Sequence, residues 1–532
     1  MRTFPVHARG AALVTVLFIM VILVILIGSL LTVIPAELRQ VAFSGYDNRA
    51  LYAADGGIEA LTQGLQLGDT SLGVGSLVAP DGSTSTYKAT VLATASSCGL
   101  QQHLIQSIGT SPSGDQREIA AVVAQTTLSD YGLWVNNNPD GVYLVSGLSH
   151  YDGAVYLAGG ASDPQLVNYI VGKTPIFDDQ VTFAGNTVKW FNDGNSTSQP
   201  AQTNGPAWAA VDAGGYAKVT VGGQTESYPG SQTSIQLANA AYGTPGGSSY
   251  PSPKSGNTVY MNQQPAGGAG GNLSSGIYIL GDSGVTMTSS TAGAVPSTMT
   301  WSFAPVAGDK NSIVDPVTVA VNYTTNTTII TDATTKKTTT FTGVPSQTGS
   351  TNSNSGIVYD AGNVQDVAGT YNGSYTLAVP DDGTTNDAIY VSNSVIAHDN
   401  PQTDATSSDT FGLYGNDIYI DDKSKSIPYN LTIQAALVTG NASEVAAATD
   451  DGTFTTRDDA ANIPLYGKVT LYGSLAENIY GETYTFSGTT QKTGWAKNFL
   501  SDPRFSTCPP PGSPLVSPDG WHLVAWKDEG AP

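Results

Sequence analysis

The sequence predicts a mainly β protein that begins with a long α-helix. Three observations lead to this prediction. Residues 11–34 form an uncharged apolar run, glycine and tyrosine are abundant at 60 and 26 residues, and short β-prone runs recur along most of the chain. We expect a small antiparallel sheet beside the helix and a large inserted β-solenoid. A β-sandwich is the alternative, because it also uses short alternating strands.

The apolar run near the start is long enough to cross a membrane. It covers residues 11–34, and its polar side chains are limited to those of Thr15, Ser29 and Thr32. About 24 residues at a rise of about 1.5 Å span the hydrocarbon core of a bilayer. A cleaved secretory signal has a shorter apolar region of about 7–15 residues. The run therefore predicts a membrane helix, with a kink near Pro35 where it ends.

The helical pattern continues beyond this segment. Apolar residues at spacings of three and four share one helical face. They are Leu51, Ala54, Ile58, Leu61 and Leu65.

The start of the chain resembles the type IV pilins. Its short leader is basic and ends at Gly10, and residues 9–14 fit the Arg-Gly-x-Ala-Leu-Val pattern of PilX-like minor pilins and K-type pseudopilins. Residues 50–57 are similar to the Ala-x-x-Ala-Ala-Glu-Ala-Gly segment of the same group. The resemblance implies cleavage between Gly10 and Ala11 by a prepilin peptidase. It also implies assembly with other pilins and the pilus machinery at the inner membrane, followed by display on the pilus or cell surface.

One position departs from the pilin pattern. Most pilins carry glutamate as the fifth mature residue, and this chain has Thr15 there. In the family, that carboxylate pairs with the N-terminal amine of a neighbouring subunit inside the apolar filament core, where a charge needs a partner. The K-type pseudopilin also lacks the glutamate and caps its filament. The resemblance therefore implies a minor subunit located at a filament tip.

The pilin resemblance also predicts how the rest of the chain is divided. Residues 87–95, 103–108 and 117–125 read as strands of a small head sheet, although three alanines leave a helix open for residues 118–124. Residues 521–526 alternate as a last strand that rejoins this sheet. We divide the chain into a leader (1–10), an assembly helix (11–66), the first part of the head (67–130), an insertion (131–500) and a C-terminal return (501–532).

The insertion carries repeated short strands that favour a solenoid. Residues 364–377, 431–437 and 470–475 resemble a domain found in large PilX-like proteins. The whole layout looks like the large competence minor pilins of the Thermus–Deinococcus group, which insert a β-solenoid into a pilin head. Residues 324–342 are rich in threonine, and they fit either an exposed strand pair or a loop.

The charge of the chain disfavours bulk binding to nucleic acid. There are 43 acidic residues against 21 lysines and arginines, so the formal net charge is −22. Phosphate backbones are bound largely through lysine and arginine. Extracellular DNA or a surface ligand is a partner implied by the resemblance alone.

We expect neither an enzyme nor a cofactor. The histidines and cysteines lack zinc-site spacing, and no phosphate-binding loop is present. Paired aspartates begin at residues 381, 421, 450 and 458, but acidic pairs beside glycine and asparagine are usually turns. Calcium is the metal that best fits the sequence, because it takes hard oxygen ligands. Its candidate ligands are Asp381, Asp382, Asp387, Asp417, Asp421 and Asp422.

The two cysteines lie near opposite ends of the region that follows the helix. Cys98 follows the first predicted head strand and Cys508 precedes the last. If the solenoid is inserted within the head, the two residues come together and form a disulfide. Two free thiols are the alternative.

These observations together predict a minor subunit of a type IV pilus-like filament. Its large β head would serve adhesion or DNA uptake, and the subunit would assist filament initiation. The alternatives are a type II secretion pseudopilin and a membrane-anchored β-helix surface protein that binds or cleaves carbohydrate.

Overall fold

The chain folds into two compact units. The computed structural model describes residues 45–135, 143–145, 148–157, 281–345, 356–379, 388–440 and 452–531, apart from a few residues within these ranges, and short strands between residues 168 and 279. One unit contains residues 1–93, 103–123 and 525–532, and the other contains residues 94–102 and 124–524. Both are built mainly from strands, which confirms the predicted fold class at this level.

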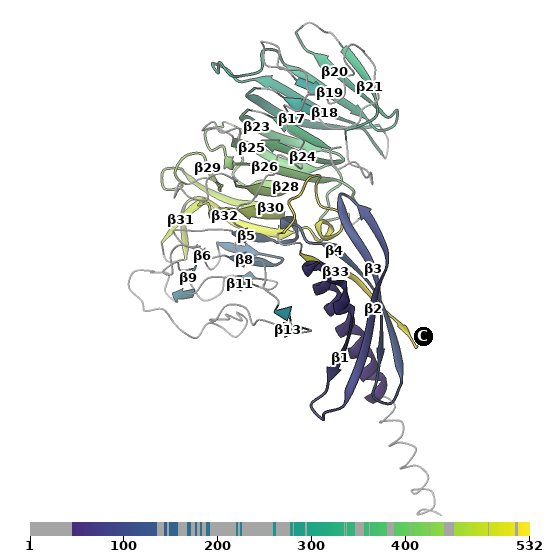
Figure 1. The fold of residues 1–532 in the computed structure, drawn as a ribbon. Coiled ribbons are helices and arrows are strands. Elements are labelled where there is room, and N and C mark those ends of the chain that lie inside the picture. Colours follow the sequence, from purple (N-terminus) through teal and green to yellow (C-terminus); the bar gives the residue numbers. More distant parts are fainter. Residues whose placement is uncertain are drawn as a thin grey trace, which may run out of the picture. The chain divides into compact units, whose positions relative to one another are not determined.

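The smaller unit combines a helix with a five-stranded sheet (Figure 1). The helix is described over residues 45–67. The strand order is β1-β2-β3-β4-β33, so the last strand of the chain lies beside the fourth and the predicted return of residues 521–526 is confirmed. The strand bounds are β1 (Val74–Val78), β2 (Thr84–Ser97), β3 (Leu100–Thr110), β4 (Gln116–Gln125) and β33 (Trp521–Gly530), and a short 3-10 helix η1 (Thr70–Gly73) precedes β1.

Helix and sheet approach closely because small residues line their contact. Ala50, Ala53 and Ala54 are fully buried. A Cβ added at Gly109 of β3 would lie 2.0 Å from the backbone oxygen of Ala50, so only glycine fits there. Of the five residues predicted for the buried helix face, Ala54, Ile58 and Leu61 are buried, whereas Leu51 and Leu65 are half-buried. The buried face is therefore turned toward the alanines.

The larger unit contains a 23-stranded sheet in which most neighbouring strands are parallel. One parallel series runs β16-β22-β24-β26-β28-β30-β5-β8-β11, so strands from early in the chain add to strands from its end. Its members are β16 (Ile277–Ile279), β22 (Ile357–Asp360), β24 (Ser374–Val379), β26 (Thr410–Gly415), β28 (Leu431–Thr439), β30 (Leu465–Glu477), β5 (Leu133–Val135), β8 (Val155–Leu157) and β11 (Val181–Phe183).

Two further parallel series complete this part of the unit. The first is β17-β23-β25-β27-β29 and the second is β30-β32-β7-β10. Their additional members are β17 (Ser283–Ala292), β23 (Val364–Tyr371), β25 (Ala388–Ala397), β27 (Asp417–Ile420), β29 (Phe454–Thr456), β32 (Thr490–Ser501), β7 (Ser149–Tyr151) and β10 (Ile176–Phe177). Two strands pair antiparallel at its margins, β15 (Val259–Met261) with β16 and β31 (Tyr484–Ser487) with β32.

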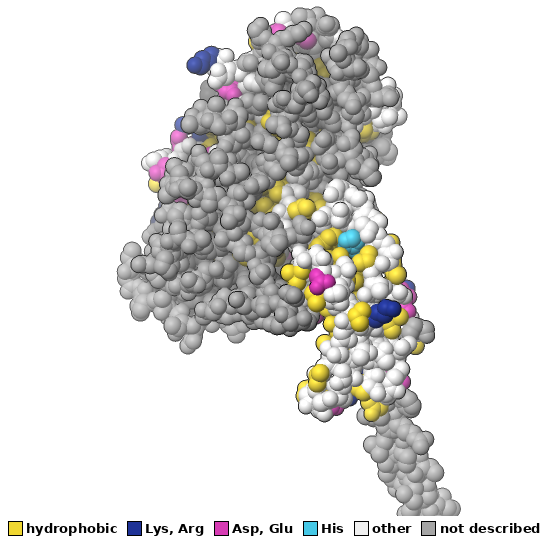
Figure 2. Space-filling view, viewed as in Figure 1, with side chains coloured by type: hydrophobic (Ala, Val, Ile, Leu, Met, Phe, Trp, Pro, Cys, Tyr) yellow, Lys and Arg dark blue, Asp and Glu magenta, His cyan; other side chains and the backbone are white. Residues whose placement is uncertain are grey.

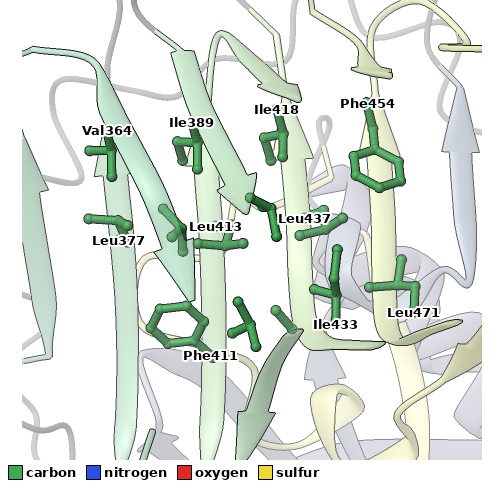
Figure 3. Close-up of a cluster of buried hydrophobic side chains, with 14 of the residues drawn as sticks. Val364, Leu377, Ile389, Phe411, Leu413, Ile418, Ile433, Leu437, Phe454 and Leu471 are labelled. Carbon is green, nitrogen blue, oxygen red and sulfur yellow. The ribbon is translucent and has the colours of Figure 1, made fainter. Parts of the chain in front are cut away.

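The core lies between these series. In-register pairing stacks one aliphatic residue per strand, and Leu377, Leu413, Leu437 and Leu475 follow one another. Figure 3 shows the opposing row of Val364, Ile389, Ile418 and Phe454, which faces Leu377, Leu413 and Leu437 across the interior. All eight residues are buried. A second cluster on the other side of the series includes Trp134, Tyr156 and Tyr414, and Phe505 and Val516 of the C-terminal segment pack on it. The 3-10 helices η2 (Leu128–Asp130) and η3 (Pro503–Ser506) flank this second cluster.

An antiparallel meander begins with β17 and extends the sheet from that strand. Strands β17 to β21 pair in sequence order, and Figure 1 shows them side by side. The threonine-rich segment is thus a strand pair, which is one of the two structures expected for it. The new members are β18 (Val295–Pro305), β19 (Val317–Asn322), β20 (Thr327–Asp332) and β21 (Thr338–Thr342). Two small separate sheets contain β6 (Tyr143–Val145), β9 (Asn168–Val171) and β12 (Val188–Phe191), and β13 (Thr220–Val221) and β14 (Gln224–Thr225).

Candidate functional site

The predicted processing and membrane residues lie outside the described residues. These are Gly10, Ala11, Thr15 and Pro35, together with the apolar run of residues 11–34. Among the residues that the structure describes, none of the helices has the length and hydropathy needed to cross a bilayer.

Arg117 links three elements of the smaller unit. Its guanidinium contacts Asp528 of β33, and Nη1 lies 3.4 Å from Oδ2 of Asp47 on the helix. A second arginine, Arg49 of the helix, lies 2.7 Å from Oδ2 of Asp81. All three ion pairs are partly exposed, so each contributes little energy by itself. Their effect is to orient the helix on the sheet.

The smaller unit also exposes apolar side chains. Figure 2 shows hydrophobic and uncharged polar atoms over most of its described surface in this view, with few charged groups. Tyr52, Val74, Val78 and Leu92 are each more than half exposed.

The two cysteines are joined in the structure. Cys98 and Cys508 form a disulfide with a Cα–Cα distance of 5.1 Å, and both belong to the larger unit. Cys98 and Gly99 form the turn between β2 and β3, and both have positive φ angles of 50° and 83°. This is the conformation of a type I′ hairpin turn. Beside it, the side-chain amide of Gln102 donates to the backbone oxygen of Thr507.

The described calcium candidates are bound by the protein itself. Asp417 Oδ1 accepts hydrogen bonds from the backbone N–H groups of Gly452 and Thr453, each at 3.0 Å. Asp421 forms an ion pair with Arg457 at 3.1 Å.

Asp422 accepts a hydrogen bond from the backbone N–H of Asp458 at 2.9 Å. Asp417, Asp421 and Asp422 therefore tie one turn of the sheet to the next. Asp381, Asp382 and Asp387 lie outside the described residues.

The structure brings one histidine to two carboxylates, which sequence reasoning missed. The donor atoms of His398, Asp399 and Asp409 lie within 4.8 Å of one another. Both Asp409 oxygens already accept backbone hydrogen bonds, from Gly373 at 2.7 Å and from Asp399 at 3.0 Å. His398 Nδ1 lies 2.9 Å from Asp399 Oδ1. The adjacent His398 and Asp399 were the available signal in the sequence. The hydrogen bonds within this cluster hold a loop closed.

A buried pair of opposite charges was also missed. Lys497 is 1% exposed and Glu477 is fully buried. Both bind the backbone of the same residue, because Glu477 Oε2 accepts from Gly481 N at 3.1 Å and Lys497 Nζ donates to Gly481 O at 2.7 Å. The lysine Nζ also lies 3.5 Å from the centre of the Tyr480 ring. Glu477 Oε1 has no hydrogen-bond partner among the described residues.

Burial shifts the titration of both groups toward their neutral forms. Desolvation raises the pKa of Glu477 from 4.5 to about 7 and lowers the pKa of Lys497 from 10.5 to about 8. The charge of Lys497 lowers the pKa of Glu477, and the charge of Glu477 raises the pKa of Lys497, so each partly opposes the effect of burial on the other. The surrounding titratable groups are Tyr151, Tyr480 and Glu482, and burial raises the pKa of both tyrosines. Sequence could not reveal the pair, because its members are ordinary charged residues of separate strands.

Comparison with known proteins gives one similar structure. No family model matches the chain, and no curated protein matches it. Among solved structures, the chain is similar to the competence-associated pilin ComZ from Thermus thermophilus. The two share 13% sequence identity over 91% of this chain and 98% of that chain, with a TM-score of 0.26.

Proposed function

We propose that the chain is a minor subunit of a type IV pilus-like filament, anchored and assembled through its N-terminal helix and located at the filament tip. The observation that carries the proposal is the basic leader ending at Gly10, followed directly by the uncharged run of residues 11–34. The described helix of residues 45–67, packed on a small sheet, supports it.

In this proposal the larger unit is a β-solenoid presented by the filament. Its support is the parallel pairing of successive strands and the stacked aliphatic rows such as Leu377, Leu413 and Leu437. Most of the unit is encoded between β4 and β33, so it is an insertion in the sequence of the small sheet. It would present a surface for adhesion or DNA uptake and would need no metal or cofactor.

The test is the N-terminus of the mature protein. We expect mass spectrometry of protein from cells with a prepilin peptidase to give Ala11 as the first residue. Protein from cells without the peptidase should retain Met1. Retention of Met1 in both strains, or cleavage beyond Ile34, would remove the proposal.

A type II secretion pseudopilin would be processed in the same way, so a second measurement separates it. Deletion of the gene should reduce surface pili or DNA uptake in the pilus case. A loss of protein secretion with normal piliation would favour the pseudopilus.

A further inference from the structure

The meander of strands β17 to β21 has two faces of opposite character. One face is buried and apolar, with Met287, Trp301 and Val319 in register across β17, β18 and β19. Along each strand, the residues that alternate with the buried ones point to the opposite face. Those residues are half-exposed or exposed.

The outward face is covered with hydroxyl groups in register. One row crosses all five strands as Thr286, Ser302, Thr318, Thr331 and Thr338. Two further rows, which begin at Thr288 and Ser290, continue the pattern except at Ala320, Asn322 and Ile329. On the other side of the first row, Gly284 and Ala304 lack a hydroxyl group. Strands lie about 4.8 Å apart and alternate residues about 6.8 Å apart, so the hydroxyls form a regular grid.

The face carries no charge although the chain is strongly acidic. None of the outward residues between 286 and 342 on these strands is Asp, Glu, Lys or Arg, whereas the chain has a net charge of −22. A phosphate polymer would lack the cations that bind it. An acidic polymer would meet a protein of its own sign. A neutral partner is the one that matches this face.

Three neighbouring hydroxyl groups of the grid are available, whereas those of Ser290 and Thr298 bind each other. Those of Thr318, Thr331 and Thr338 make no hydrogen bond to another group in the described part of the chain. Threonine is restricted at χ1, so little rotamer entropy is lost when its hydroxyl binds. Each hydroxyl both donates and accepts, and each threonine also offers a methyl group.

We propose that this hydroxyl face binds a neutral polysaccharide. Sugar rings present hydroxyl groups at their edges and C–H groups on their faces, and a threonine grid offers a partner to both. A repeating polymer contacts many equivalent positions at once, which adds individually small contributions. The inference does not rest on the proposed filament function, since the face belongs to the chain whether or not it is assembled.

The experiment uses the full chain in a zwitterionic detergent without a sugar head group. The protein is mixed with insoluble cellulose, chitin or curdlan and sedimented, and the free protein is measured as a function of polymer amount. We expect saturable sedimentation with at least one polymer that persists in 0.5 M sodium chloride. Absence of sedimentation with all three, or binding abolished by salt, would overturn the proposal.

Matched variants localise the binding. T318V/T331V/T338V removes three neighbouring hydroxyls but keeps size and β-propensity, and it should weaken binding about tenfold or more. The control T84V/T86V/T90V removes three exposed hydroxyls from β2 of the smaller unit and should bind like the wild type. Equal binding by both variants would overturn the assignment to this face.

A second variant guards against a folding defect. Thr318→Arg places a bulky cation on the half-exposed outward side and leaves the buried face unchanged. It should abolish sedimentation while its circular dichroism spectrum matches the wild type. Unchanged sedimentation by this variant would also overturn the proposal.

Discussion

At the residue scale, the buried pair of Glu477 and Lys497 gives the structure an unusual dependence on pH. A glutamate with a raised pKa stabilises the fold below its ordinary value of 4.5, and this contribution is lost as pH rises through about 7. A lysine with a lowered pKa stabilises the fold above its ordinary value of 10.5, and this contribution is lost as pH falls through about 8. The pair is therefore least favourable between about pH 7 and 8.

We expect the variant E477Q/K497M to be more stable than the wild type near pH 7.5, by about 1–4 kcal/mol. Its advantage should shrink at pH 5 and at pH 10, where one wild-type group is neutral. Urea unfolding of the larger unit at the three pH values measures this. A stability difference that does not change with pH would contradict the assigned titrations.

Thr15 is the second residue whose chemistry predicts an outcome. If the subunit occupies a tip, no neighbouring subunit requires a carboxylate at position 15. The variant Thr15→Glu should then enter filaments no better than the wild type. Quantitative blotting of sheared pili measures the incorporation. Wild-type protein that is abundant along the shaft would instead exclude the tip position.

At the scale of elements, the contact between helix and sheet depends on Gly109. An added Cβ would lie 2.0 Å from Ala50 O and 2.3 Å from Ala54 N, and neither backbone atom can move without shifting the helix. We expect Gly109→Ala to destabilise the smaller unit by about 2–4 kcal/mol. Thermal unfolding followed by circular dichroism measures the loss.

The control is Gly45→Ala on the same helix. An added Cβ at Gly45 meets no atom within 4 Å. Alanine there should be neutral or stabilising by up to about 1 kcal/mol, because it lowers the entropy of the unfolded chain. Equal effects of the two substitutions would show that Gly109 is not a close contact.

Local sequence predicted the elements better than their partners. The sequence identified four of the five strands of the small sheet and missed β1. The ambiguous residues 118–124 form a strand because Ile119, Ala121 and Val123 face inward together. The buried face of the helix is rotated from the predicted one. Alanines contribute little to an apolar pattern in the sequence, yet they allow the closest approach of helix and sheet. The Glu477–Lys497 pair arises from the pairing of β30 with β32, and the His398 cluster arises from the closure of a loop, so neither is recorded in the local pattern of the sequence.

At the scale of the whole molecule, the disulfide closes a very long loop. Cys98 and Cys508 are separated by 410 positions, and loop-closure entropy gives an upper value of about 6 kcal/mol for such a link. We expect C98S/C508S to lower the stability of the larger unit by less than this limit. Thermal unfolding, with Gln102→Ala as a neighbouring control that keeps the disulfide, measures it.

Non-reducing peptide mapping checks the link itself. Protein from the cell envelope should yield one peptide pair that contains both cysteines. Two free thiols in that material would refute the link, and the stability of C98S/C508S should then equal that of the wild type.

The pairing of β30 with β5 sets the order in which the chain can be completed. Leu475 lies beside Leu133, so the strand of residues 133–135 finds this neighbour only after nearly the whole chain has been synthesised. Until then the backbone N–H and C=O groups of this strand edge are unpaired, a state that favours wrong strand pairing and aggregation. A chain that stops before residue 465 therefore lacks the strand that pairs with this edge, and it cannot complete its core.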